Sequence, residues 1–299
     1  MEELQLVKNK IKDFVQECND EKSLQLLDLL ATGKMLRSKL ILKIAGQTEA
    51  SIKLCAVVEM IHAASLLHDD VIDEADTRRG KPSINAIFDN KTSIMFGDIL
   101  YSKAFTELAL MDRKIAHKVA NAVTLLSIGE MHDVDLTENF NSDYSKYKEM
   151  IYKKTASLIE ASAYAAALLV GKDEERYALY GKNLGLAFQM IDDILDITQD
   201  SETLGKPAML DFVEGKVTIP YLLLHQRLDE EQSKLESLYK KELSSEESSW
   251  IKTKMEQTGA LEDSISQAKA LGNEAILLLE DENSPELIMI MKAMIEREF

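Results

Sequence analysis

Two acidic segments far apart in the chain have the same spacing. Residues 69–73 and 192–196 both read Asp-Asp-x-x-Asp. Because residues four apart share one face of a helix, we expect the first and last aspartate of each pattern to lie side by side. Carboxylates so placed repel each other unless a cation lies between them, and Mg²⁺ commonly binds one or two carboxylates together with substrate phosphates. The spacing therefore predicts two magnesium-binding clusters.

A solvated acidic face is the alternative, because the chain carries 52 Asp and Glu against 35 Lys and Arg, a net charge of -17. Both patterns, however, adjoin strongly apolar helical segments at 60–67 and 184–191, whereas a solvated face would be mostly polar. The apolar flanks favour metal binding. The predicted metal site therefore contains six aspartates, namely Asp69, Asp70, Asp73, Asp192, Asp193 and Asp196.

Basic side chains follow each acidic pattern. Residues 78–81 read Arg-Arg-Gly-Lys, and Lys206 and Lys216 come after the second pattern. Lys34 and Arg37 are three residues apart, which places them on one face near the expected start of a helix. Helix N-termini and arginine forks are common binding sites for phosphate oxygens. Acids, bases and apolar helices together indicate a metal-bound diphosphate with an apolar tail.

Helical periodicity runs through most of the chain. It contains only 12 Gly and 4 Pro in 299 residues, which leaves few helix breakers. Apolar residues recur at spacings of three and four over 34–45, 51–67, 92–111, 115–131, 143–170, 174–197, 219–227, 248–258, 261–279 and 285–296. No run alternates with a period of two for long enough to predict a sheet. We therefore expect an all-α fold and a single domain over residues 1–299.

Composition also limits the partners and the compartment. An acidic chain with a pI of about 4.8 repels phosphate backbones and anionic lipid, so we expect no nucleic-acid partner. Cys18 and Cys55 have no metal-type spacing and are expected to be reduced. The first residues lack the pattern of a signal peptide, and the most apolar run, 161–170, is shorter than the ~20 residues that span a bilayer. These features predict a cytoplasmic protein with no transmembrane segment.

Several segments resemble those of trans-type polyprenyl diphosphate synthases, in the family's order and over nearly the whole chain. They are Gly33-Lys34-x-x-Arg37, residues 61–73, residues 76–82, Gly97-Asp98, Lys154-Thr155-Ala156, residues 188–196, Gly205-Lys206-Pro207 and residues 214–220. The resemblance implies an isoprenoid synthase-like bundle of ten or more helices around a deep central cavity, in a protein that is usually a homodimer.

The resemblance also implies which residues bind metal and the allylic substrate. Direct Mg²⁺ ligands would be Asp69, Asp73 and Asp192, with Asp70, Asp193 and Asp196 as outer partners. The allylic diphosphate (farnesyl or geranylgeranyl diphosphate) would be bound by Arg78, Lys154 and Lys206.

The remaining roles implied by the resemblance concern the second substrate and the leaving group. Isopentenyl diphosphate would be bound by Lys34, Arg37, His62 and Arg79. Thr155 and Gln189 would support the carbocation and the leaving group. Lys216 would lie in a flexible loop that closes over the diphosphate.

His62 has an ordinary alternative, because a lone histidine on an apolar helix is usually a core residue. It lies seven residues before Asp69, hence on the same face, and matches the family position, which favours contact with substrate. The chain departs from the family at Thr32, Ser38 and Asn85, where Gly, Pro and His are common. We expect Thr32 and Ser38 to alter the stiffness of their loop and Asn85 to change one hydrogen bond to substrate. None of the three differences removes a charge that the reaction needs.

Product length depends on the side chains just before the first acidic pattern. Ala64 and Ser65 lie one turn before Asp69, where an aromatic residue would block a growing chain as in short-chain members of the family. Residues 85–93 also resemble the octaprenyl-type branch. We therefore predict a long-chain product of quinone side-chain type, with octaprenyl the best guess, and geranylgeranyl or farnesyl diphosphate as the alternative.

The reaction implied is head-to-tail transfer of an allylic group to isopentenyl diphosphate. A class I terpene cyclase would pair one aspartate motif with an Asn-Ser-Glu type second site, which this chain lacks. A di-iron bundle needs two Glu-x-x-His motifs, and only Glu59 with His62 provides one. A non-catalytic subunit of a heteromeric synthase would be expected to have lost some aspartates or bases, and both sets are intact.

Overall fold

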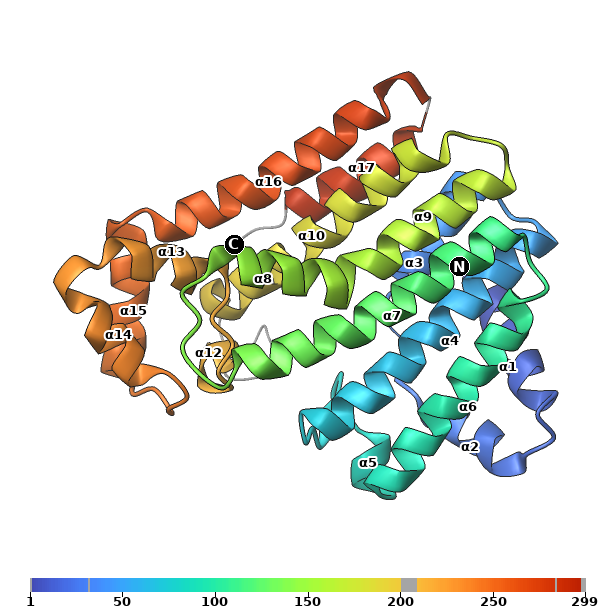
Figure 1. Ribbon diagram of the computed structural model, residues 1–299, viewed down its shortest axis with the longest axis horizontal. Helices are drawn as coiled ribbons and strands as arrows, with labels where there is room; N and C mark the ends of the chain where they lie inside the picture. The colour runs from blue at the N-terminus through green and yellow to red at the C-terminus, as the bar shows by residue number, and fades with distance from the viewer. Residues whose placement is uncertain (1, 32, 200–208, 283, 297–299) are drawn as a thin grey trace. The chain divides into compact units, whose positions relative to one another are not determined.

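The computed structural model describes residues 2–31, 33–199, 209–282 and 284–296, and helices make up most of this chain (Figure 1). The all-α fold with ten or more helices is confirmed within these residues. The chain folds into two compact units. Unit 1 is Met1–Thr124 with Leu158–Ala178, and unit 2 is Leu125–Ser157 with Leu179–Phe299. The single domain over 1–299 stays a prediction, and each unit is described by itself.

Unit 1 is built around the helix that ends in the first acidic pattern. Helix α4 packs against α1, α3 and α6, and α6 also packs against the short α5. The helices that belong wholly to this unit are α1 (Glu2–Gln16), α2 (Glu21–Leu29), α3 (Leu36–Ala45), α4 (Glu49–Ile72), α5 (Ile84–Ile87) and α6 (Asn90–Leu108). Between α4 and α5 lie two short strands, β1 (Thr77–Arg78) and β2 (Lys81–Pro82).

Helix α4 has a strong start signal and an apolar body. Thr48 and Ser51 form a reciprocal capping box, in which each side-chain oxygen accepts the other residue's backbone N–H, at 3.1 and 2.8 Å. By length and composition α4 could cross a membrane, but 67% of its most apolar window is buried inside the protein. That burial, against α1, α3 and α6, is the behaviour of a core helix.

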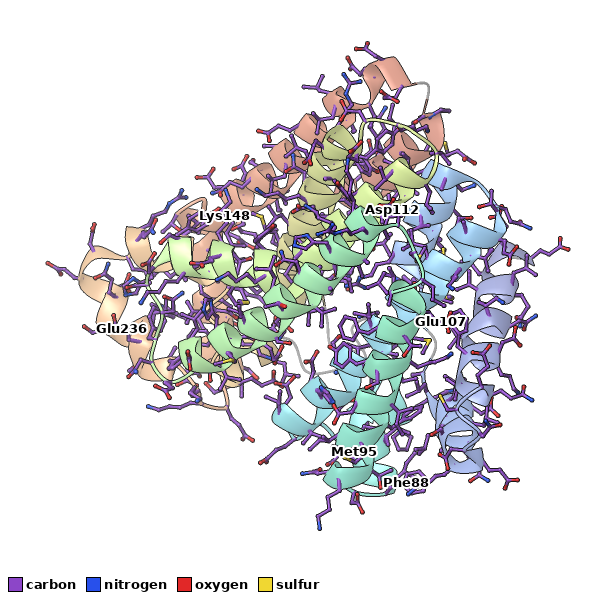
Figure 2. All side chains as sticks on the ribbon, turned by 45° about the vertical axis from the view of Figure 1, so that its right-hand side comes forward. Phe88, Met95, Glu107, Asp112, Lys148 and Glu236 are labelled. Carbon is purple, nitrogen blue, oxygen red and sulfur yellow. The ribbon has the colours of Figure 1, made fainter. Side chains whose placement is uncertain are left out.

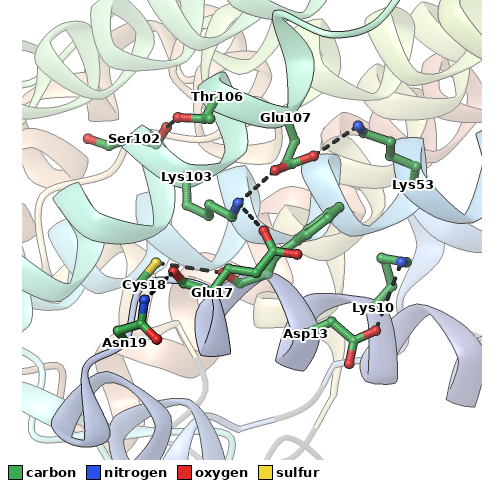
Figure 3. Close-up of polar contacts among 11 residues, drawn as sticks. Lys10, Asp13, Glu17, Cys18, Asn19, Lys53, Ser102, Lys103, Thr106 and Glu107 are labelled. Carbon is green, nitrogen blue, oxygen red and sulfur yellow. Dashed lines mark hydrogen bonds and ion pairs between the residues drawn. The ribbon is translucent and has the colours of Figure 1, made fainter.

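A network of charged side chains joins α6 to α1 and α4 (Figure 3). Lys103 on α6 donates to Glu17 at 2.5 Å and to Glu107 at 2.6 Å, and Lys53 on α4 lies 2.9 Å from Glu107. Burial raises the pKa of Glu107, but the hydrogen bonds from Lys103 and Lys53 outweigh burial and leave this pKa lowered. Glu107 is therefore an ionised, buried link between helices of unit 1.

Unit 2 contains the second acidic pattern and the C-terminal helices. In this unit α16 packs against α13, α15 and α17, drawn in orange and red in Figure 1. Its complete helices are α8 (Tyr144–Ile151), α12 (Leu210–Val213), α13 (Ile219–Arg227), α14 (Gln232–Leu238), α15 (Ser245–Gln257), α16 (Ala260–Leu278) and α17 (Pro285–Ile295). A π-helical segment, Tyr152–Ala156, follows α8, and single 3₁₀ turns span Asp229–Glu231 and Glu280–Glu282.

Three further helices lie within the described residues. They are α7 (Arg113–Leu136), α9 (Ser157–Leu169) and α10 (Glu174–Thr198), and each contributes residues to both units. The continuous periodicity over 143–170 predicts one helix, whereas the structure divides that stretch into α8, the π-helical segment and α9. A π turn adds a single residue to a helix, and an apolar pattern of period 3.6 does not reveal it.

Candidate active site

The first acidic pattern occupies the last turn of α4. Asp73 is the residue that caps this helix, and its backbone N–H donates to the carbonyl of Asp69 at 2.8 Å. The spacing of four is thus a helical turn, with Asp69 half-buried and Asp73 exposed. Two carboxylates on one face repel each other, and they also meet the negative end of the helix dipole. A cation at this position would relieve both costs.

Asp70, the middle aspartate of the first pattern, has a basic partner. It is only 4% exposed, and its Oδ1 accepts a hydrogen bond from Arg78 Nε at 2.6 Å. Burial raises the pKa of Asp70, an effect that the Arg78 charge partly offsets. Arg78, predicted to bind the allylic diphosphate, is therefore paired with an acid of unit 1.

The hairpin β1–β2 places the two arginines. Thr77 pairs with Pro82 and Arg78 with Lys81, so that Arg79 and Gly80 form the two-residue turn. Both turn residues have positive φ, 54° and 73°, as a type I′ hairpin turn requires. Arg79 has a different partner from Arg78, since its Nη1 donates to the carbonyl of Ala31 at 3.2 Å.

Asn85, where many family members have His, contacts backbone of unit 1. Its amide nitrogen donates to the carbonyl oxygens of Ala75, at 3.0 Å, and Asp70, at 3.3 Å. Ser83 Oγ also donates to Ala75, at 2.7 Å. These bonds tie the end of α4 to the segment that follows the hairpin. Asn85 therefore has a structural explanation that the sequence does not reveal.

A basic cluster in unit 1 includes most of the residues expected to bind isopentenyl diphosphate. The guanidinium of Arg79 lies against Gly33, where an added Cβ would come within 2.3 Å of Nη1. Burial, then the charges of Arg37 and Arg79, lower the pKa of His62 well below its usual range. The imidazole is therefore neutral at pH 7. Lys34 is exposed at the same loop.

Thr32, one of the departures from the family, lies outside the described residues. Its neighbours in sequence, Ala31 and Gly33, both contact the Arg79 guanidinium, Ala31 through its carbonyl oxygen and Gly33 through close approach. A Cβ at Gly33 would displace the guanidinium of Arg79, which gives a physical reason for the glycine of the Gly-Lys-x-x-Arg segment.

The second acidic pattern lies in α10, where Asp193 meets neutral side-chain donors. Asp193 is 4% exposed and accepts hydrogen bonds from Tyr147 Oη at 2.6 Å and from Gln189 Nε2 at 2.9 Å. Burial, with the nearby charges of Asp211 and Asp192, raises the pKa of Asp193 to about 8. Asp192 is half-buried.

Asp196 is the most buried aspartate of the second pattern, at 2% exposure. One carboxylate oxygen accepts the backbone N–H of Asp211 at 3.2 Å, and its backbone carbonyl accepts the N–H of Met209 at 2.8 Å. These bonds fix the start of α12, where Met209 has a positive φ of 61°. Asp196 therefore holds the backbone that follows α10.

The π-helical segment places Lys154 and Thr155 beside other predicted site residues of unit 2. Thr155 Oγ1 donates to Gln189 Oε1 at 2.9 Å, and Gln189 in turn donates to Asp193. The structure thus brings Thr155, Gln189 and Asp193 into one chain of hydrogen bonds, to which Tyr147 adds a further donor. π-helical turns inside helices occur frequently at functional sites.

Lys154 is held by two acids of α7. Its Nζ lies 2.5 Å from Asp133 and 2.9 Å from Glu130. Burial lowers the pKa of Lys154, but the two carboxylates outweigh burial and raise it. The backbone of α7 is also close, since a Cβ at Gly129 would lie 2.3 Å from Lys154 N. The sequence does not predict these two acids as site residues, although their spacing of three places both on one helix face.

Lys216 lies in a turn of unit 2. Its Nζ is 3.0 Å from Glu214, and the adjoining Gly215 has a φ of 94°. The Tyr239 hydroxyl lies 2.8 Å from the carbonyl of Gly215 and 2.8 Å from that of Thr137, which ties the turn to the end of α7. Lys206 lies outside the described residues, so its assignment stays a prediction.

Ala64 and Ser65 are both buried in unit 1. Ser65 Oγ donates to the carbonyl of His62 at 2.9 Å. A Cβ at Gly97 on α6 would come within 3.3 Å of the Ala64 carbonyl, so α4 and α6 approach closely at this level. Close packing of α4 and α6 is therefore a physical reason for the glycine at position 97, and the effect of Ala64 and Ser65 on product length stays a prediction.

The aspartates suit a magnesium site that substrate completes. Within the described ranges, no group of three or more His, Cys, Asp or Glu is arranged to hold a metal by itself. Asp69 and Asp73 offer hard oxygen ligands on one helical turn, and Mg²⁺ typically takes one or two carboxylates plus phosphate and water. The donor set of the first pattern therefore fits Mg²⁺ bound together with a diphosphate.

Comparison with known proteins identifies the family. The family described as polyprenyl synthetase matches residues 22–255, and the chain belongs to this family. The crystal structure of an octaprenyl pyrophosphate synthase from Helicobacter pylori aligns over 99% of both chains, with a TM-score of 0.94 and 44% identity.

Curated relatives differ in how much of their length they share with the chain. An octaprenyl diphosphate synthase from Escherichia coli (strain K12) is 42% identical over 183 residues, which is 58% of this chain and 55% of that protein. A short chain isoprenyl diphosphate synthase from Methanocaldococcus jannaschii is 36% identical over 259 residues, 82% of this chain and 79% of that protein. The match to the Escherichia coli protein thus spans about half of its length.

Proposed function

We propose that the protein is a trans-polyprenyl diphosphate synthase that adds isopentenyl diphosphate head-to-tail to an allylic diphosphate. The observation that carries this proposal is the repeated aspartate pattern on two helices, α4 and α10, with bases in both units. Similarity to an octaprenyl pyrophosphate synthase over 99% of both chains supports a long-chain product, which we propose to be octaprenyl diphosphate. This product would supply the side chain of a quinone.

Magnesium is the proposed cofactor. Asp69, Asp73 and Asp192 would bind it directly, while Asp70, Asp193 and Asp196 would act through the bonds that they make within each unit. When bound, Mg²⁺ would stabilise the negative charge that develops on the departing pyrophosphate. The bonds of Asp70 to Arg78 and of Asp193 to Tyr147 support an outer role for these two acids.

The chain's own residues bind and orient the two diphosphates. Arg78, Lys154 and Lys206 would hold the allylic diphosphate, and fixed positive charge beside a leaving group is typically the largest catalytic contribution in a site shielded from water. Thr155 and Gln189 offer fixed dipoles for the developing allylic cation, and their hydrogen bond keeps both oriented.

Isopentenyl diphosphate would bind at the basic cluster of unit 1. Lys34, Arg37 and Arg79 supply charge there, and the neutral imidazole of His62 supplies a hydrogen bond to a phosphate oxygen. Its setting among arginines favours this role over that of a core histidine. The proton lost after bond formation would pass to pyrophosphate, so no protein nucleophile is required. Lys216 would cover the allylic diphosphate.

We also propose that the protein acts in the cytoplasm as a homodimer. Exposed apolar side chains gather around α5 and the start of α6, where Phe88 is 48% and Met95 is 56% exposed (Figure 2). Ile87 and Ile94 are exposed beside them. Neighbouring apolar side chains of this kind are typical of surfaces that another protein covers.

Purified protein tests the function with Mg²⁺, labelled isopentenyl diphosphate and farnesyl or geranylgeranyl diphosphate, the products being dephosphorylated and sized by reverse-phase separation. A single long-chain product is expected, and Ser65→Phe should shorten it. A farnesyl or geranylgeranyl product would keep the chemistry and overturn the assignment of Ala64 and Ser65. No elongation with any allylic primer would favour a non-catalytic subunit.

A further inference from the structure

The start of α3 is capped by an acid from another helix. Met35 precedes α3 in a left-handed conformation, φ 49°, and provides no side-chain cap. Instead, Glu59 Oε1 on α4 accepts the backbone N–H of Ser38 at 3.2 Å and the Ser38 hydroxyl at 2.7 Å. Backbone N–H groups in a first helical turn have no partner within the helix, and a carboxylate there also meets the positive end of the dipole.

Ser38 is essential to this arrangement. Many family members have Pro at this position, and proline has no backbone N–H to donate. The hydroxyl adds a second, shorter bond to the same carboxylate oxygen. These bonds hold the Glu59 carboxylate at the beginning of α3, against Ser38, the residue that follows Arg37.

Arg37 is left with a buried donor. Within the described parts of the chain its Nε is shielded from solvent and has no hydrogen-bond acceptor. A buried donor without a partner costs about 1–3 kcal/mol, so such a group requires an explanation, and a bound ligand that accepts its hydrogen bond is one. Glu59 is close enough to act electrostatically on both Arg37 and Arg79, yet the hydrogen bonds of its Oε1 are to Ser38.

We propose that Ser38 and Glu59 are a positioning pair that holds Arg37 ready for the diphosphate of isopentenyl diphosphate. The Glu59 carboxylate accepts hydrogen bonds from Ser38 and so anchors the first turn of α3. Arg37 Nε then remains available to donate a hydrogen bond to a phosphate oxygen. Neither residue touches the reacting atoms. This proposal rests on the proposed function, since it assigns the basic cluster of unit 1 to that substrate.

Steady-state kinetics of Ser38→Ala, Glu59→Ala and Glu59→Gln test the pair. The two alanine variants should raise KM for isopentenyl diphosphate about tenfold, with kcat within about twofold of the original. Glu59→Gln should restore most of the affinity, because its amide oxygen accepts the same two bonds. Ser162→Ala is the matched control, since it removes a buried hydroxyl that donates to a carbonyl of its own helix at 2.6 Å, and it should change neither constant.

Calorimetry with inorganic pyrophosphate in the absence of Mg²⁺, which keeps the aspartate patterns from binding it through the metal, separates this proposal from the proposed function, because it needs no turnover. Ser38→Ala should bind about tenfold more weakly than the original chain and should keep its helical circular dichroism. Unchanged affinity in both alanine variants, or an equal loss in Ser162→Ala, would overturn the pair. A chain that binds pyrophosphate as expected and makes no product would leave the pair standing and reject the proposed function.

Discussion

Asp70 and Asp193 occupy the same place in the repeated pattern and are equally buried, but the two units hold them differently. Asp70 accepts a bond from the charged Arg78, delivered by a hairpin. Asp193 accepts bonds from neutral groups, the Tyr147 hydroxyl and the Gln189 amide. The same aspartate spacing thus occurs with a charged partner in unit 1 and with neutral partners in unit 2.

The last aspartates of the two patterns also differ, in their exposure to solvent. Asp73 is exposed at the end of α4, whereas Asp196 is buried within α10 and accepts the backbone N–H of Asp211. The helix continues past the second pattern for part of a turn and ends at Thr198, while α4 stops at Ile72. The last aspartate thus faces solvent where α4 stops before it, and supports the following backbone where α10 continues past it.

The largest expected effect comes from replacing the first aspartate of each pattern, a residue for which we propose the same role in both units. Asp69→Asn and Asp192→Asn should each lower kcat by at least about a hundredfold, because each removes charge that stabilises the metal-bound leaving group. Helix content by circular dichroism should not change. Normal turnover in either variant would reject its assignment as a metal ligand.

Glu107→Gln tests how far charge pairing supports unit 1. Loss of charged bonds to Lys103 and Lys53 should lower the free energy of unfolding by about 3 kcal/mol at pH 7. The folded-state pKa of Glu107 is lowered, so its stabilisation is complete above its ordinary value and is lost as the pH falls through the folded pKa. The difference between the original chain and Glu107→Gln should therefore shrink below about pH 4.5. A difference independent of pH would contradict the charged network.

Asn substitutions at Asp70 and Asp193 compare the charged partner of the first aspartate with the neutral partners of the second. Asp70→Asn should cost about 2 kcal/mol by urea unfolding, because a charged hydrogen bond to Arg78 is lost. Asp193→Asn should cost about 1 kcal/mol or less, since an amide oxygen still accepts from a neutral donor. Raising the salt concentration should reduce only the first difference. Equal costs with equal salt dependence would remove the distinction between the units.

The smallest effects are expected from the last aspartates. Asp196→Ala should lower the free energy of unfolding by about 1 kcal/mol, because the N–H of Asp211 loses its acceptor. Asp73→Ala should change it by less than about 0.5 kcal/mol, as for other exposed sites, while still reducing turnover. Thermal unfolding and a turnover assay on both variants measure this contrast, and a larger stability loss at Asp73 would refute it.

The all-α fold could be predicted because apolar spacing and few glycines or prolines act locally. The same spacing predicts that the aspartates lie on helices. The apolar periodicity before the first pattern ends at residue 67, whereas α4 continues to Ile72. Strands of two residues, such as β1 and β2, are too short to show alternation. Local patterns thus locate helices better than their ends.

Partners contributed by distant segments could not be predicted. The sequence identifies Lys154 as a binding residue, but Asp133 and Glu130 come from another helix and give no signal beside it. The resemblance suggests a substrate contact at position 85, although Asn85 bonds to the backbone of α4. Periodicity shows which face of a helix is apolar and says nothing about which side chain will lie opposite.

We propose that Asp69 and Asp192, one from each acidic pattern, serve a single reaction step. The most direct test compares turnover of Asp69→Asn, Asp192→Asn and the double variant at saturating Mg²⁺ and substrate. Residues that act as a unit are strongly non-additive, so the double variant should be little slower than the slower single variant. Losses that multiply in the double variant would show that the patterns act independently, and would contradict the account.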